Sequence, residues 1–167
     1  ARVGSTLTCA DTGTAADGGT PTISNAWPAG CTAATYAIVD SDDPGDSISC
    51  TATATDSDGG TDTGTASATV TNTDPVMGTV SVSPSTGQVG DILTCAATGT
   101  DADGGTPTIS YAWPDGSTAA TYTIVDSDDP GDSITCTATA TDSDGGTDTG
   151  TARATVTNTD PVMGTVS

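Results

Sequence analysis

The sequence Ile-Thr-Cys-Thr-Ala-Thr-Ala at residues 134–140 places threonine at every second position, with apolar or small side chains between. A period of two residues is typical of a β-strand that buries one face and exposes the other. Residues 151–157 alternate in the same way, and Asp-Gly-Gly and Pro-Gly-Asp turn sequences interrupt the chain at short intervals. No stretch has the spacing of an amphipathic helix. The sequence therefore predicts an all-β fold of short strands.

The chain consists of two copies of one repeat. Residues 1–81 align without gaps with residues 87–167, an offset of 86, and 10 of the 79 aligned positions from Val3 onward differ. Near-identity over the length of a domain indicates a recent duplication or one unit of a long homogeneous array. The predicted strands of one repeat lie near residues 76–83, 91–98, 107–113, 119–125, 133–141 and 147–157. Six or seven short strands are typical of a small two-sheet β-sandwich.

A linker at residues 71–75, Thr-Asn-Thr-Asp-Pro, separates the repeats, because the residue before a proline favours extended or turn geometry. This divides the chain into a first repeat at 1–73 and a complete repeat at 74–159. Residues 160–167 are then the first strand of a following repeat, and the first repeat lacks that strand.

The end of the chain carries the strand sequence that the first repeat lacks. Residues 162–167 have the same sequence as residues 76–81, which open the second repeat. In a covalent array this strand would begin the next repeat, whereas between separate copies it would complete a neighbour by strand addition. The predicted strand-donor residues are Val162, Met163 and Val166.

The charged residues argue against several classes of function. Twenty-two acidic residues, all aspartate, stand against two arginines, which gives a formal net charge of −20 without any Lys or His. A His general base, a Schiff-base lysine and a P-loop lysine are therefore missing, and we expect no enzymatic activity. An acidic surface repels phosphate, so we expect no nucleic-acid partner. No apolar run approaches the roughly 20 residues of a membrane span, so we expect no membrane insertion.

Six motifs in the second repeat carry a resemblance to a known group of proteins. They are Asn-Thr-Asp-Pro-Val at 72–76, Gly-Asp-Ile-Leu-Thr-Cys at 90–95, Thr-Gly-Thr-Asp-Ala-Asp-Gly at 98–104, Tyr-Ala-Trp at 111–113, Pro-Gly-Asp-Ser-Ile-Thr-Cys at 130–136 and Thr-Ala-Thr-Asp-Ser-Asp-Gly at 139–145. This combination resembles the bacterial Ig-like/PKD-like tandem repeats of large secreted or surface proteins. The resemblance implies two tandem Ig-like β-sandwiches that serve as a stalk, spacer, adhesin or fibre subunit.

The resemblance also implies one inter-sheet disulfide in each repeat, packed against a tryptophan. The implied pairs are Cys9 with Cys50, beside Trp27, and Cys95 with Cys136, beside Trp113. Each disulfide would contribute roughly 4 kcal/mol in the chain-entropy model, which a core of mostly Ala, Val and Ile needs. The alternative is that the four cysteines are reduced and buried as small apolar residues. Disulfides would imply an oxidising location, extracellular or at the cell surface.

Cys31 breaks the symmetry of the repeats, since the equivalent position in the second repeat is Ser117. An odd cysteine in a secreted chain indicates either an intermolecular disulfide or an unpaired, passive thiol. Both interpretations of Cys31 stay open.

The aspartates are concentrated in loops that a sandwich topology would gather at the junction between repeats. Ca²⁺ takes about six to eight oxygen ligands from carboxylates, carbonyls and water. The candidate Ca²⁺ ligands are Asp42, Asp43, Asp74, Asp101, Asp103, Asp142 and Asp144. The alternative is that the Asp-Gly-Gly sequences only form turns, in which aspartate bonds its own backbone and glycine adopts positive φ.

These patterns favour a structural role over catalysis. We expect a repeat unit of an extracellular filament, stalk or surface array, whose partners are copies of itself joined head to tail, covalently or by strand addition. The alternative is a calcium-stiffened spacer of a bacterial adhesin or carbohydrate-binding surface protein. The 38 threonines would also offer sites for a surface O-linked glycan, whereas no Asn-x-Ser/Thr acceptor sequence is present.

Overall fold

The structure, a computed structural model, describes residues 1–164 and is all-β. These residues form twelve strands and one 3₁₀ turn at Pro28–Gly30, and no α-helix occurs among them. No helix in the described chain is long and apolar enough to cross a membrane. The prediction of an all-β fold is therefore confirmed.

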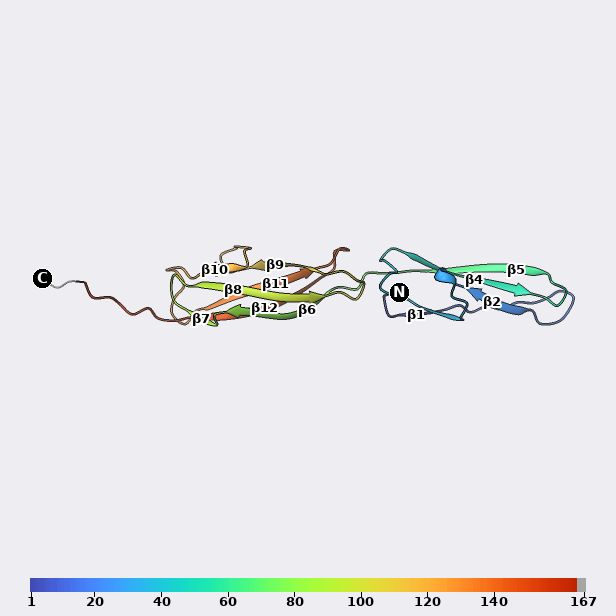
Figure 1. Cartoon of the computed structure of the whole chain (residues 1–167), viewed down its shortest axis with the longest axis horizontal. Coiled ribbons are helices and arrows are strands. Elements are labelled where there is room, and N and C mark those ends of the chain that lie inside the picture. Colours follow the sequence, from blue (N-terminus) through green and yellow to red (C-terminus); the bar gives the residue numbers. More distant parts are fainter. Residues whose placement is uncertain (165–167) are drawn as a thin grey trace. The chain divides into compact units, whose positions relative to one another are not determined.

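The chain divides into two compact units (Figure 1). The first unit comprises Ala1–Thr73 together with Ala102–Gly104, and the second unit comprises Asp74–Asp101 and the chain from Gly105 onward.

The second unit contains two sheets. One has the order β10-β8-β6, formed by Thr121–Thr123, Ile92–Thr100 and Val76–Ser83. The other has the order β7-β12-β11-β9, formed by Thr86–Gly87, Thr147–Val156, Ser133–Thr141 and Thr108–Ala112. All pairs are antiparallel except β7 with β12.

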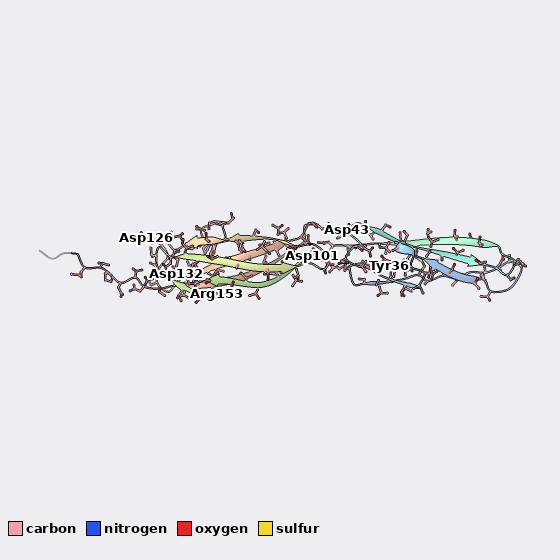
Figure 2. All side chains as sticks on the ribbon, viewed as in Figure 1. Tyr36, Asp43, Asp101, Asp126, Asp132 and Arg153 are labelled. Carbon is pink, nitrogen blue, oxygen red and sulfur yellow. A yellow bond between two sulfur atoms is a disulfide. The ribbon has the colours of Figure 1, made fainter. Side chains whose placement is uncertain are left out.

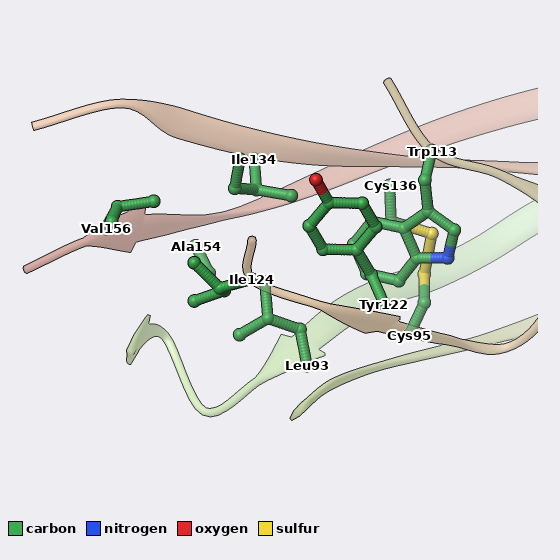
Figure 3. Packing of buried hydrophobic residues seen from close by; sticks show 9 residues of the cluster. All are labelled: Leu93, Cys95, Trp113, Tyr122, Ile124, Ile134, Cys136, Ala154 and Val156. Atoms are coloured by element: carbon green, nitrogen blue, oxygen red, sulfur yellow. A yellow bond between two sulfur atoms is a disulfide. The ribbon is translucent and has the colours of Figure 1, made fainter. Parts of the chain in front are cut away.

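The core of the second unit lies between these sheets (Figure 3). The alternating strand β11 buries Ile134, Cys136 and the alanines that follow, and its threonines stay on the other face. Cys136 is bonded to Cys95 of β8, with the two Cα atoms 6.3 Å apart. The Trp113 and Tyr122 rings stack beside this disulfide, with centroids 5.3 Å apart. A core of small side chains is thus fixed by one covalent link and one aromatic pair.

The first unit repeats this arrangement with fewer strands. β1 (Thr6–Thr8) pairs with β3 (Thr35–Ala37), and the second sheet has the order β2-β4-β5, formed by Thr22–Ala26, Ser47–Thr55 and Thr61–Thr69. The disulfide is Cys9–Cys50, with a Cα–Cα distance of 6.1 Å, and the Trp27 and Tyr36 rings stack at 5.6 Å. Both predicted disulfides are confirmed.

The units differ at the edge strands. In the second unit β8 is nine residues long and lies between β6 and β10. In the first unit the equivalent strand β1 has three residues and pairs only with β3, and the described chain contains no counterpart of β6 or β7 there. Backbone groups without a neighbouring strand lose their ladder hydrogen bonds, so β1 ends early.

Candidate functional site

A tyrosine–aspartate hydrogen bond closes the same loop in each unit. In the second unit the Tyr122 hydroxyl donates to Asp128 Oδ2 at 2.9 Å, and the same oxygen accepts from the Val125 amide at 2.9 Å. Burial, and then the hydrogen bond to Asp128, raise the pKa of Tyr122 to about 12. In the first unit the Tyr36 hydroxyl donates to Asp42, a predicted Ca²⁺ ligand, at 3.1 Å. Asp42 therefore holds its loop in place.

The Asp-Ser-Asp-Gly-Gly loops are organised by their first aspartate. Asp142 Oδ1 accepts hydrogen bonds from the amides of Asp144 and Gly146, at 2.9 and 2.8 Å. In the first unit Asp56 makes the same pair of bonds. An aspartate that bonds amides two and four residues ahead stabilises a turn. The turn interpretation thus explains the position of Asp142.

The loop between β10 and β11 carries further aspartates, including Asp126 and Asp132 (Figure 2). Asp132 Oδ2 accepts from the Asp129 amide at 2.9 Å, and in the first unit Asp46 Oδ2 accepts from the Asp43 amide at 3.2 Å. Asp43, a predicted ligand, is therefore also part of a local turn.

The remaining predicted Ca²⁺ ligands have different environments. Asp103 is buried and its Oδ2 accepts from the Thr73 amide, and both residues belong to the first unit. Asp101 is half-buried, while Asp74 and Asp144 are exposed. Within residues 1–164 no group of three or more His, Cys, Asp or Glu side chains could hold a metal ion. Binding of Ca²⁺ by the seven aspartates therefore stays a prediction.

Cys31 forms no disulfide within the chain as described. It is half-buried and packs against the core of the first unit. An intermolecular disulfide through Cys31 also stays a prediction.

The first unit has an open groove of about 370 Å³ between its two sheets. Residues 7–11, which continue β1, line one side, and residues 64–68 of β5 line the other. The floor includes Trp27, Ile48 and Cys50 of the core. The groove therefore leads from solvent to the disulfide-pinned core.

In the second unit β6 occupies the equivalent space. Val82 lies opposite Cys95 in the β6–β8 ladder, and Val80 and Val82 pack against the core. A Cβ placed on Gly150 of β12 would lie 2.6 Å from Val80 Cγ2 and 2.9 Å from Met77 Cγ. At the equivalent Gly64 of β5, no atom of the described chain lies within 4 Å of such a Cβ. The groove is thus the space that β6 fills in the second unit.

The open groove leaves core side chains of the first unit partly uncovered. Leu93 and Tyr122 are buried beneath the complete sheet of the second unit. Their equivalents Leu7 and Tyr36 are only half-buried. Covering half-buried apolar side chains in an open groove would lower the free energy, because it would remove apolar surface from water.

Of the three predicted strand-donor residues, Val162 and Met163 follow the last strand, in a stretch without regular secondary structure. Val162 is 95% exposed and Met163 is 83% exposed, while Val166 lies outside the described residues. In β6, Val76 is 62% exposed, whereas Met77 and Val80 are half-buried.

Sequence reasoning missed the groove of the first unit, which Gly64 helps to line. The available signal was a glycine in the middle of a strand, which often marks close approach by another backbone or ligand. That signal is present at both Gly64 and Gly150.

Comparisons with known proteins show limited similarity. No family model matches the chain, and no curated protein matches it. Among solved structures, the chain is similar to one described as "Ca2+-stabilized adhesin helps an Antarctic bacterium reach out and bind ice", with 18% sequence identity and a TM-score of 0.35. That similarity covers 84% of this chain and 40% of the adhesin chain, so this chain spans less than half of the adhesin's length.

Proposed function

We propose that the chain is a structural repeat unit of an extracellular filament, stalk or surface array, in which Ig-like sandwiches follow one another head to tail. The observation that carries this proposal is the repetition of one disulfide-pinned β-fold in two units whose sequences are nearly identical. Selection for a specific ligand site would distinguish one unit from the other, whereas a scaffold needs only the same folded module many times.

The chemistry of the chain supports a scaffold in an oxidising location. Two disulfides persist outside the reducing cytoplasm, which favours an extracellular or surface location. A net charge of −20 keeps neighbouring copies soluble through mutual repulsion. Asp42, Asp56 and Asp142 accept hydrogen bonds within their loops, which supports a structural role for these carboxylates.

Electron microscopy of native material in negative stain tests this function. We expect regular filaments or rods with an axial repeat set by the two units. A denatured mass far above the 16.0 kDa of this chain would indicate covalent joining, and a mass of 16.0 kDa would indicate assembly from separate copies. Compact single particles without any elongated assembly would contradict the proposal.

The same images, recorded in Ca²⁺ and after chelation, test the predicted aspartate ligands. Loss of stiffness after chelation would favour the calcium-stiffened spacer as the function. Unchanged stiffness would leave the aspartates with the turn roles that their hydrogen bonds describe.

A further inference from the structure

We propose that the second unit resists tension applied along the chain, and that the short parallel pair β7–β12 is the element that resists it. The inference rests on the proposed function, because a repeat unit of a filament or stalk is pulled through the residues that precede and follow it. It assigns a mechanical role to a strand of two residues and to the side chains that hold it.

The first segment and the last strand of the second unit run in the same direction. At one end the Met77 amide of β6 donates to Asp148 of β12 at 2.8 Å. At the other end β7 pairs in parallel with the last two residues of β12 (Figure 1). The chain enters the unit beside the first of these ends and leaves it beside the second. Tension therefore pulls β6–β7 and β12 past each other along the strand axis.

Hydrogen bonds between strands resist this direction of loading best. The bonds lie across the strands, so a sliding force loads all of them at once and they must break together. A force that peels the strands apart from one end breaks the same bonds one after another. The strength of the unit therefore depends on the bonds between the two segments that slide.

The entering segment is also held by a second ladder. β6 pairs with β8, but the register of this ladder shifts between Met77 and Val80. β8 belongs to neither of the two segments that tension pulls, whereas the β7–β12 pair joins one loaded segment directly to the other. Both ladders must break before the entering segment detaches, and the β7–β12 pair carries load from both sides.

Backbone bonds hold β7 against a buried part of the unit. The Thr155 amide donates to Ser85 O at 3.0 Å, and the Thr157 amide donates to Gly87 O at 2.7 Å. Gly87 is buried, and a Cβ on it would lie 2.9 Å from Ile124 Cδ1 in the core. Burial strengthens such bonds and slows their exchange for bonds to water while the strands slide.

Two side chains extend the pairing beyond the ends of both strands. The Thr157 hydroxyl donates to Gly87 O at 3.1 Å, beside the bond from its own amide. The Gln88 side-chain amide donates to the Asn158 carbonyl at 2.8 Å, and the Gln88 backbone amide donates to Asp91 Oδ2. We call residues 85–88 and 155–158, with these bonds, the clamp.

The first unit makes the corresponding central bonds. The Thr71 amide and hydroxyl both donate to Ala1 O, as the Thr157 amide and hydroxyl donate to Gly87 O. Thr71 and Ala1 are the equivalents of Thr157 and Gly87 under the 86-residue offset. The bonds are therefore a property of the repeat.

The Cys95–Cys136 disulfide limits how far the second unit extends once the clamp breaks. Residues 96–135 lie in the loop that the disulfide closes, and they include β9 and β10. Tension passes through the disulfide and bypasses this loop. Only the segments before Cys95 and after Cys136 can then be pulled out.

Single-molecule force spectroscopy of the full chain measures this resistance. Handles are attached through thioether bonds at Asp74→Cys and Thr159→Cys, in the Cys31→Ser background, so that the second unit alone is loaded. Reduction should lengthen the extension after rupture by about 140 Å, because Cys95 and Cys136 are 41 residues apart. Equal extensions before and after reduction would overturn the role of the disulfide.

Two variants remove bonds of the clamp. Thr157→Pro removes both donors to Gly87 O and should lower the rupture force by about a third or more. Gln88→Ala removes the bond to Asn158 and should lower the rupture force by a smaller amount. Because Gln88→Ala leaves the backbone bonds intact, it tests the clamp even where Thr157→Pro fails to fold.

Tyr122→Phe is the matched control, because it removes a hydrogen bond that lies outside the loaded path. Tyr122 and its acceptor Asp128 both lie within the loop that the disulfide closes. The variant should lower the free energy of unfolding in denaturant and leave the rupture force unchanged. A rupture force that Tyr122→Phe lowers as much as Gln88→Ala would overturn the assignment to the clamp.

The direction of the load supplies a second control. Asp144 lies in the loop between β11 and β12, at the end of the unit where Met77 bonds to Asp148. Handles at Asp74→Cys and Asp144→Cys would peel the strands from that end, and the unit should rupture at about half the force or less. Equal rupture forces in the two directions would overturn resistance by sliding strands.

The outcomes separate this inference from the proposed function. Clamp variants that rupture at the force of the parent would overturn the mechanical role of β7–β12. Filaments or rods in electron micrographs of native material would then still support the filament, stalk or surface array, with units that do not resist tension through this pair.

Discussion

At the scale of single residues, the tyrosine–aspartate pairs determine how stability depends on pH. Tyr122 is buried in the core of the second unit, Tyr36 is half-buried against the core of the first unit, and each donates its hydroxyl to an aspartate. Ionising the tyrosine would place two negative charges together in a partly desolvated site. Burial, followed by the bond to the aspartate, raises the pKa of each tyrosine above 10.0.

We predict that the second unit loses stability as the pH rises from about 10 to about 12. The unfolded chain releases the Tyr122 proton near the ordinary pKa of 10.0, whereas the folded unit keeps it to about 12. Because the folded state then binds more protons, its free energy of unfolding falls through this window and is fully present below it. Denaturant unfolding at pH 8 and pH 11, in the Cys31→Ser background, measures the change.

Tyr122→Phe is the matched variant for this prediction. It should cost about 1–2 kcal/mol at pH 8, because Asp128 loses its hydroxyl donor, and should reduce the loss between pH 8 and pH 11. Equal pH dependence in parent and variant would contradict the assignment to Tyr122.

At the scale of strands, the alternation of threonine with apolar residues was sufficient to predict most of the second unit. Residues 133–141 form β11 as predicted, and residues 76–83 form β6. The two-residue strand β7 was not predicted, because Thr86–Gly87 is too short to show a period. The shortness of β1 was not predictable from residues 6–14 alone, since a nearly identical sequence forms the long strand β8. The neighbouring strand, rather than the local sequence, determines its length.

The candidate site, like the strands, could be predicted from the sequence only in part. The cysteine pairs could be predicted because the two cysteines and the tryptophan recur together in both repeats and resemble an Ig-like pattern. The roles of Asp42 and Asp142 could not be predicted, because an aspartate beside glycine is equally compatible with a turn and with a metal site. Only the positions of the amide and hydroxyl donors around each aspartate distinguish a turn from a metal site.

The matched glycines Gly64 and Gly150 test whether a strand covers each sheet. Gly150→Ala should destabilise the second unit by about 1–3 kcal/mol, because the new Cβ would overlap Val80 and Met77. Gly64→Ala should change the free energy of unfolding by less than about 0.5 kcal/mol, because the space above it is open among the described atoms. Thermal unfolding of each variant gives both values. Equal losses in the free energy of unfolding for the two variants would contradict the prediction, because they would mean that both glycines lie under a strand.

At the scale of the whole molecule, the two units bury the same core positions to different extents. The second unit covers its core with β6, and Leu93, Cys136 and Val156 are buried. The first unit has the same disulfide and aromatic pair, but its groove leaves Leu7 and Tyr36 half-buried. Each Å² of apolar surface that folding removes from water contributes about 25 cal/mol to stability. The apolar surface that stays exposed in the groove contributes none of this.

We therefore predict that the chain unfolds in two transitions, with the first unit unfolding at least about 5 °C below the second. Gly150→Ala and Tyr122→Phe should lower only the upper transition, which assigns it to the second unit. Differential scanning calorimetry of the parent chain and both variants resolves the two midpoints. A single transition that both variants lower would contradict the prediction, because it would mean that the half-buried side chains of the first unit do not make it less stable than the second unit.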